Sequence, residues 1–296
     1  MGSYSTPPDF PAHPPEILPP AMGGNFAQEA ELRAVRERGS GRGAGSRSWA
    51  HAPATYILVG INCLVFLGML FSGVSIMNPT TQQLVHWGAN NPELVLTYGQ
   101  WWRVVTAMFV HVGIIHLATN MWCLWNLGLL GEPLMGPIGL FAAYILSGAA
   151  GNMLSIGINQ AFGSGTLVGA GASGAVFGIS GVLIILLKSK RLPIPPKELA
   201  GLRRYVIYFA LINFVIGFGS MAVRTAVQID NMAHLGGFLG GIIFALPLVP
   251  MIGSPRPLFR FRLRLAIGLL CSILVFFGFY ISTAVAPARD LPTEQQ

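Results

Sequence analysis

Residues 169–181 read GAGASGAVFGISG and open an apolar stretch that is long enough to cross a bilayer as a helix. Ser173 follows four small residues, so the backbone beside it can be approached closely. A serine among glycines in a membrane helix usually serves packing. The small residues Gly174, Gly178 and Gly181 recur at helical spacing and therefore predict a stripe along which another helix can pack.

A second stretch, residues 230–241, reads DNMAHLGGFLGG and supplies a matching stripe. His234, Gly237 and Gly241 are spaced i, i+3 and i+7, which places them on one side of a helix. Both stretches are expected to cross the bilayer in the same direction, from outside inward, so Ser173 and His234 start at similar depths. If the two stripes also pack together, the hydroxyl and the imidazole come within hydrogen-bond reach. A serine activated by an adjacent base is the requirement for nucleophilic catalysis.

The composition indicates a membrane protein. Mean hydropathy is +0.60 and 10% of the 296 residues are charged, against about a quarter in soluble domains. The net charge of +7 does not require a nucleic-acid partner. Outside the N-terminal 50 residues, most Lys and Arg lie in short connections between apolar stretches, where the positive-inside rule operates.

Apolar stretches near helical membrane-spanning length follow one another along the chain, and they predict an all-α membrane protein with seven spans. The predicted spans are residues 56–71, 114–130, 140–156, 168–187, 205–219, 232–252 and 265–285. Residues 1–50 are rich in Pro, Gly and Arg and predict a disordered cytoplasmic tail. The connection 72–113 mixes aromatic residues with Asn and Gly, which suits partial burial in the outer leaflet.

Polar side chains inside the spans are candidate functional groups. His116 and Asn120 are four residues apart and share a helical face, with Asn120 roughly 9 Å below the start of its span. Together with the Ser173 amide, these groups could bind a tetrahedral oxyanion. Hydrogen bonds between packed helices are an equally open explanation for either residue alone.

Several other polar residues predict structural roles. Asp230 is expected to cap the helix that carries His234, although a third member of a catalytic triad is the alternative. Asn126 and Asn213 are expected to form hydrogen bonds between helices. The three cysteines lie inside apolar spans and indicate neither a disulfide framework nor a metal site. The chain has no HExxH motif and no paired aspartates within spans, so metal-dependent and aspartyl proteases are not indicated.

In these motifs the sequence resembles the rhomboid intramembrane serine proteases. The resemblance covers roughly residues 54–252 and rests on several motifs in the expected order. The matching residues are Trp102-Arg103, His111, His116, Asn120, Gly131-Glu132, Gly171, Ser173, Gly174, His234, Gly237 and Gly241. Phe177 departs from the family pattern, in which this position is often Tyr; its ring can still stack on the His234 imidazole.

The resemblance implies a six-helix transmembrane core (54–252), followed by a basic loop and a seventh C-terminal span (253–296). It also implies a catalytic dyad of Ser173 and His234, with His116 and Asn120 binding the oxyanion. Arg103 and Glu132 are expected to brace loop ends. It implies no cofactor or metal, no nucleic acid, and single-span or other membrane proteins in the lipid bilayer as substrates. The expected location is a bacterial plasma membrane, with the N-terminus cytoplasmic and the active site opening to the outside. A catalytically inactive relative that binds membrane clients and a transporter are the alternatives.

Overall fold

The computed structural model describes residues 52–162, 168–189, 192, 194–223, 230–249 and 255–285. The predicted tail, residues 1–50, lies outside them. From Ala52 onward the chain forms one compact unit.

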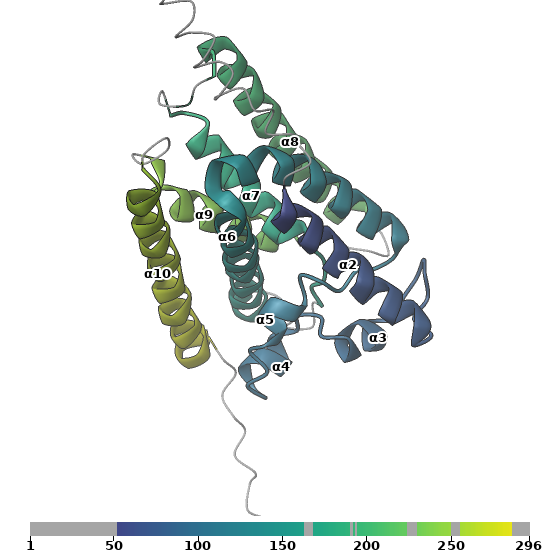
Figure 1. The fold of residues 1–296 in the computed structure, drawn as a ribbon. Coiled ribbons are helices and arrows are strands. Elements are labelled where there is room, and N and C mark those ends of the chain that lie inside the picture. Colours follow the sequence, from purple (N-terminus) through teal and green to yellow (C-terminus); the bar gives the residue numbers. More distant parts are fainter. Residues whose placement is uncertain are drawn as a thin grey trace, which may run out of the picture. The chain divides into compact units, whose positions relative to one another are not determined.

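The described part of the chain is helical, and Figure 1 shows how its helices are arranged. Within it no strand forms, and Asn90 and Gly169 make an isolated antiparallel bridge. The main helices are α2 (Pro53–Phe71), α6 (Ile114–Phe162), α7 (Ser173–Leu186), α8 (Pro196–Val223), α9 (Asn231–Ala245) and α10 (Arg256–Tyr280), which continues as a π-helix, η2 (Ile281–Val285). Three short helices lie between α2 and α6: α3 (Thr81–His86), α4 (Pro92–Leu96) and α5 (Arg103–Thr106).

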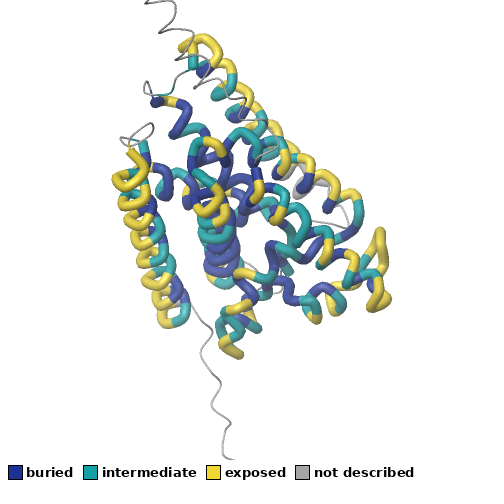
Figure 2. The backbone as a smooth tube through the Cα atoms, in the orientation of Figure 1, coloured by how far each residue is buried: buried dark blue, intermediate teal, exposed yellow. Residues whose placement is uncertain are grey.

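The lengths and composition of these helices confirm an all-α protein of the membrane. Among the described residues, four helical segments are long and apolar enough to cross a bilayer. They are Pro53–Phe71, Ile114–Phe162, Pro196–Ile216 and Arg256–Ala284. The helices α7 and α9 are apolar but shorter, at 14 and 15 residues. They are also the most buried, as Figure 2 shows by their dark blue colour against the exposed side of α10.

The predicted loop between the second and third spans, residues 131–139, is wrong. The chain stays helical from Ile114 to Phe162 and changes direction at Gly136, whose φ of 75° and ψ of 167° are not helical. Glycine adopts this positive φ without steric cost. Pro133 and Pro137 flank it, and each removes a backbone donor from the helix. One glycine therefore makes the turn for which a loop was expected.

The predicted ends of the fourth and sixth spans are also wrong, because both helices are shorter than their apolar stretches. Gly169 bonds to Asn90 instead of entering a helix (Asn90 N–H to Gly169 O, 2.7 Å; Gly169 N–H to Asn90 O, 2.9 Å). Gly171 has a φ of 122°, so α7 can begin only after it. The α9 helix ends at Ala245, just before Pro247. By contrast, α8 and α10 each begin nine residues before the predicted span, because their basic first turns are also helical.

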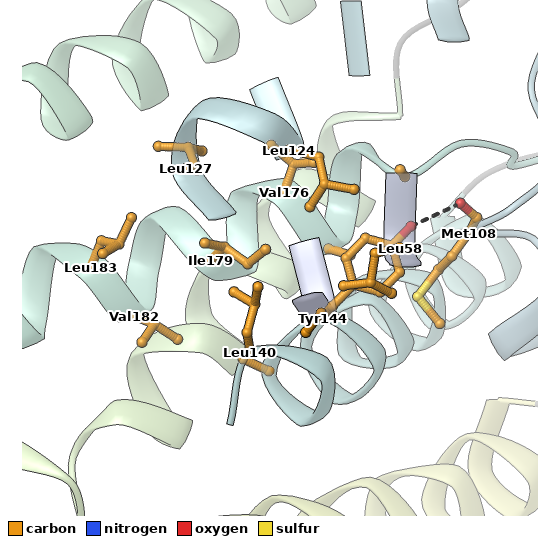
Figure 3. Packing of buried hydrophobic residues seen from close by; sticks show 14 of the residues in the cluster. Leu58, Met108, Leu124, Leu127, Leu140, Tyr144, Val176, Ile179, Val182 and Leu183 are labelled. Carbon is orange, nitrogen blue, oxygen red and sulfur yellow. Dashed lines mark hydrogen bonds between the residues drawn. The ribbon is translucent and has the colours of Figure 1, made fainter. Parts of the chain in front are cut away.

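The main core joins α2, α6 and α7. Leu58, Leu124 and Ile179 are fully buried there, and Figure 3 shows them with Tyr144 in the same hydrophobic cluster. The Tyr144 hydroxyl donates to the Met108 carbonyl (3.3 Å) and accepts from the Asn62 side chain (3.1 Å). This buried hydroxyl is therefore satisfied, as a polar group in an apolar interior must be.

Two buried charged residues act as braces, as predicted. Glu132 of α6 accepts hydrogen bonds from two backbone N–H groups at the start of α2 (2.9 and 2.8 Å) and from the Thr55 hydroxyl (2.7 Å). A carboxylate at a helix N-terminus also complements the helix dipole. Arg103 donates to the carbonyls of Val85 (2.6 Å) and Ala89 (3.1 Å) and so fixes the end of α3.

The contact between α7 and α9 is made by glycine backbones, as the two stripes predicted. A Cβ atom at Gly237 would collide with the carbonyl oxygen of Gly174, and one at Gly241 with that of Gly178. One α-helical turn separates each pair from the next, so the contact runs along both helices. The two helices therefore meet at a separation that only glycine permits at these positions.

We expect Gly237→Ala to lower stability by about 1–3 kcal/mol, because the added methyl group must push α9 away from α7. It should also reduce any activity that depends on side chains carried by these two helices. The matched control is Gly60→Ala in α2, where a Cβ would meet nothing within 4 Å. The melting temperature of both variants in detergent tests this. Equal stability of Gly237→Ala and Gly60→Ala would contradict the glycine contact.

Candidate active site

Ser173 is the first residue of α7. The first N–H groups of a helix have no acceptor within it, so the Ser173 amide stands at a positive, donor-rich helix end. The segment before it is fixed by the bridge at Gly169 and by a bond from the Gly171 N–H to the Ala107 carbonyl (2.9 Å). The start of α7, and Ser173 with it, is therefore held by backbone hydrogen bonds to Asn90 and Ala107, in the segment between α2 and α6.

His234 lies in the first turn of α9 and is 6% exposed. The Phe177 ring stacks on its imidazole, with centroids 4.3 Å apart and planes inclined by 20°, which confirms the predicted stacking. Phe214 of α8 approaches the same imidazole edge-on, at 6.3 Å. No described residue forms a hydrogen bond with the buried Nδ1 atom of His234. Ring packing therefore orients this histidine.

Asp230 is the N-cap of α9, as predicted. One carboxylate oxygen accepts from the Ala233 N–H (2.9 Å), and the other accepts a hydrogen bond from the Ser155 hydroxyl of α6. Burial raises the pKa of this carboxyl, and hydrogen bonds from Ser155 and from the backbone of Ala233 and Met232 oppose that rise. Because Asp230 uses its oxygens on Ser155 and Ala233, and His234 Nδ1 has no described partner, the triad alternative has no structural support.

His116 and Asn120 lie on the first turns of α6. The His116 ring approaches Gly171 so closely that a Cβ there would collide with it. The Asn120 side chain donates one N–H to the His116 carbonyl (2.9 Å), which leaves its second N–H for another acceptor. The buried Nδ1 atom of His116 has no hydrogen-bond partner among the described residues.

A cavity of about 330 Å³ brings these four side chains together. Ser173, His234, His116 and Asn120 all line it. The other lining residues are Val112, Thr119, Cys123, Asn152, Val168, Gly169, Ala170, Gly171, Gly174, Val176, Phe177, Phe209, Asn213, Ile216, Asp230 and Ala233. The walls are thus mainly apolar, with a few polar groups directed at one space, which is typical of a site for a small ligand or a reacting segment.

His111 supports this site from outside the cavity. Burial, with the neighbouring His116, lowers the pKa of His111 to about 3, so its ring is neutral at physiological pH. One ring nitrogen lies 3.2 Å from the Phe109 carbonyl, and Nε2 lies 3.5 Å from the Ala172 N–H. These two contacts fit a neutral imidazole that donates to Phe109 and accepts from the residue before Ser173.

The predicted interhelical bonds of two asparagines are wrong. Asn126 donates to the Trp122 carbonyl (2.7 Å) and Asn213 to the Phe209 carbonyl (2.8 Å), each within its own helix. Satisfying an amide inside one helix requires no polar partner on a neighbour.

The sequence reasoning missed Asn152 of α6, which lines the cavity and donates to the Val104 carbonyl (2.8 Å). An asparagine among the glycines and alanines of the third span was the available signal. It also missed Phe214, because an aromatic residue does not stand out within an apolar span.

Among the described residues, no three His, Cys, Asp or Glu side chains gather as metal ligands would. The cavity nevertheless offers a hydroxyl, two imidazoles, a carboxamide and a helix-start amide. That set can bind and transfer an acyl group: a nucleophile, a base and donors for an oxyanion.

Comparison with known proteins points to one family. A family model described as the Rhomboid domain matches residues 98–251, which is more than half of the chain. Rhomboid protease GluP of Bacillus subtilis (strain 168) is 32% identical over 227 residues, covering 76% of this chain and 40% of that protein. RHOMBOID-like protein 7 of Arabidopsis thaliana is 29% identical over 192 residues, covering 63% of this chain and 57% of that protein. Rhomboid-like protease 2 of Toxoplasma gondii is 31% identical over 195 residues, covering 64% of each.

The chain spans less than two thirds of the length of each of these relatives. The family match covers α6 through α9, which are the helices that carry all four candidate side chains. With several helices able to cross a bilayer, this is an integral multi-pass membrane protein. The chain belongs to the rhomboid family.

Proposed function

We propose that this protein is an intramembrane serine endopeptidase that cleaves membrane proteins through a Ser173/His234 dyad. The observation that carries the proposal is the cavity lined at once by Ser173, His234, His116 and Asn120. Two of the similar proteins bear the name protease, which supports the same activity.

The proposed reaction is acyl transfer in two steps. The Ser173 hydroxyl attacks the carbonyl carbon of the scissile peptide bond while His234 takes its proton. His234 then gives that proton to the departing amine, which leaves an acyl-enzyme. Water attacks the ester with His234 again as base, which frees the carboxylate product and restores Ser173.

The oxyanion of each tetrahedral intermediate needs donors that are already in place. The Ser173 amide at the start of α7, His116 and the second N–H of Asn120 are the proposed donors. Because Phe177 and Phe214 hold the His234 ring by packing, the base needs no carboxylate partner to keep its orientation. The dyad therefore works without Asp230.

The depth of the site supports a substrate inside the bilayer. The 14 residues of α7 span roughly 21 Å, whereas the hydrocarbon core is about 30 Å thick. If α7 ends near one surface, Ser173 at its other end lies below the opposite surface. We propose that the site opens to the outside, that the N-terminus is cytoplasmic, and that single-span membrane proteins are the principal substrates. The similar proteins come from a bacterium, a plant and a protozoan, so a bacterial membrane stays a prediction.

A second candidate function is that of an inactive family member that binds membrane clients. Such a protein has no need to keep a serine, two histidines and an asparagine around one cavity, and this chain has all four side chains there. A transporter is less well supported, because such proteins tend to have internal repeats around a midplane site and this sequence shows no clear repeat.

We expect Ser173→Ala and His234→Ala each to abolish cleavage of a single-span substrate in detergent or liposomes. The double variant should be no worse than either single one, because the two residues act as a unit. The matched control is Ser180→Ala, since the Ser180 hydroxyl is buried in the same helix and bonded to the Val176 carbonyl (3.1 Å). Melting temperatures should stay nearly unchanged in the three single variants. Clear cleavage by Ser173→Ala would overturn the mechanism.

We expect Asn120→Ala to lower kcat by about ten- to hundredfold, because an oxyanion donor acts mainly in the transition state. The loss should be milder than that of Ser173→Ala, since His116 and the Ser173 amide remain. Asn126→Ala is the control, because Asn126 makes the same bond within the same helix but does not line the cavity. The readout is kcat and melting temperature on one purified sample. An unchanged kcat with a lowered melting temperature would show a purely structural Asn120.

A further inference from the structure

The first turns of α10 carry four arginines within nine residues, in the sequence RPLFRFRLR. Arg256, Arg260 and Arg264 follow one another at intervals of four and are all exposed. We call these three residues the arginine row. At 1.5 Å per residue, neighbours in the row are about 6 Å apart along the axis, close enough for two guanidinium groups to share one phosphate.

The row has no counter-charge on its own helix. Residues 255–285 contain no Asp or Glu. No described residue forms a hydrogen bond or ion pair with the three side chains. The half-buried Arg262, on the other side of the same turns, also has a buried Nε atom without a described partner. Within the described residues, the four arginines at this helix end therefore have no counter-charge, and an anion from the surroundings can supply it.

The position of the row around α10 indicates what kind of anion fits. Leu263, Ala266 and Leu270 are buried and mark the side that faces the rest of the protein. At 100° per residue the arginine row lies about a quarter turn from that side. Phe261 and Leu265, which are 54% and 43% exposed, lie farther round the helix, away from the buried side. An amphiphile with a phosphate at the row and an acyl chain beside Phe261 and Leu265 satisfies both surfaces.

We propose that the arginine row of α10 is a binding site for the headgroup of an anionic glycerophospholipid. Arginine suits this ligand because its planar guanidinium donates two parallel hydrogen bonds to phosphate oxygens. The proposal is independent of the proposed protease function, because none of these residues lines the cavity. The rival explanation is that these charges only set topology, as basic residues beside membrane spans do in general.

The test measures association of spin-labelled phosphatidylglycerol and spin-labelled phosphatidylcholine with the full-length protein in phosphatidylcholine bilayers. The wild type should prefer phosphatidylglycerol severalfold. Because the row supplies the paired guanidinium donors for the headgroup phosphate, Arg256→Gln/Arg260→Gln/Arg264→Gln should abolish the preference. The matched control is Lys188→Gln/Arg203→Gln/Arg204→Gln, which also removes three positive charges, but next to other spans. That control should keep the preference.

The triple lysine variant (Arg256→Lys/Arg260→Lys/Arg264→Lys) covers the case in which the glutamine variant inserts or folds incorrectly. It keeps the charges that set topology but loses the forked donors, so its preference should fall partway. Equal association of the two lipids, an equal loss in the Lys188/Arg203/Arg204 control, or full preference in the lysine variant would overturn the proposal. Displacement by inorganic phosphate at constant ionic strength would identify a free-phosphate site and overturn the assignment to lipid.

Discussion

The backbone contact between α7 and α9 is the constraint on which the rest of this structure depends. Gly237 against Gly174 and Gly241 against Gly178 fix the separation and the register of the two helices. Ser173 precedes the first of these contacts and His234 lies one turn before Gly237, so the register also fixes the two side chains relative to each other. Further glycine contacts between α6 and α9, at Gly151 and Gly236, hold the pair inside the bundle.

Hydrogen bonding distinguishes the two histidines of the candidate site from several structural polar groups. Glu132 and Tyr144 are buried and Asp230 is half-buried, and each has a partner on a neighbouring helix. Asn126 has its partner within its own helix. The Nδ1 atoms of His116 and His234 are buried beside the cavity without a described partner. An unpaired buried nitrogen is costly. It is tolerable at a site where water or a reacting group is to be bound.

Much of this arrangement could be predicted from the sequence, because glycine spacing and isolated polar residues carry it directly. The stripes at Gly178 and Gly241 and the cap at Asp230 followed from local spacing, whereas the stacking of Phe177 followed from the family resemblance. The turn at Gly136 could not be predicted, since apolar periodicity does not reveal a single positive φ. The late start of α7 depends on the pairing of Gly169 with Asn90, which is far away in the sequence.

The most direct test of the central claim is covalent labelling by a small fluorophosphonate, which reacts with a serine activated by an adjacent base. Peptide mass spectrometry of the labelled, folded protein locates the adduct. We predict one adduct on Ser173 in the wild type, none in His234→Ala, and unchanged labelling in Ser180→Ala. Equal labelling of Ser173 in wild type and His234→Ala would contradict the account, because it would mean that the serine is not activated by this histidine.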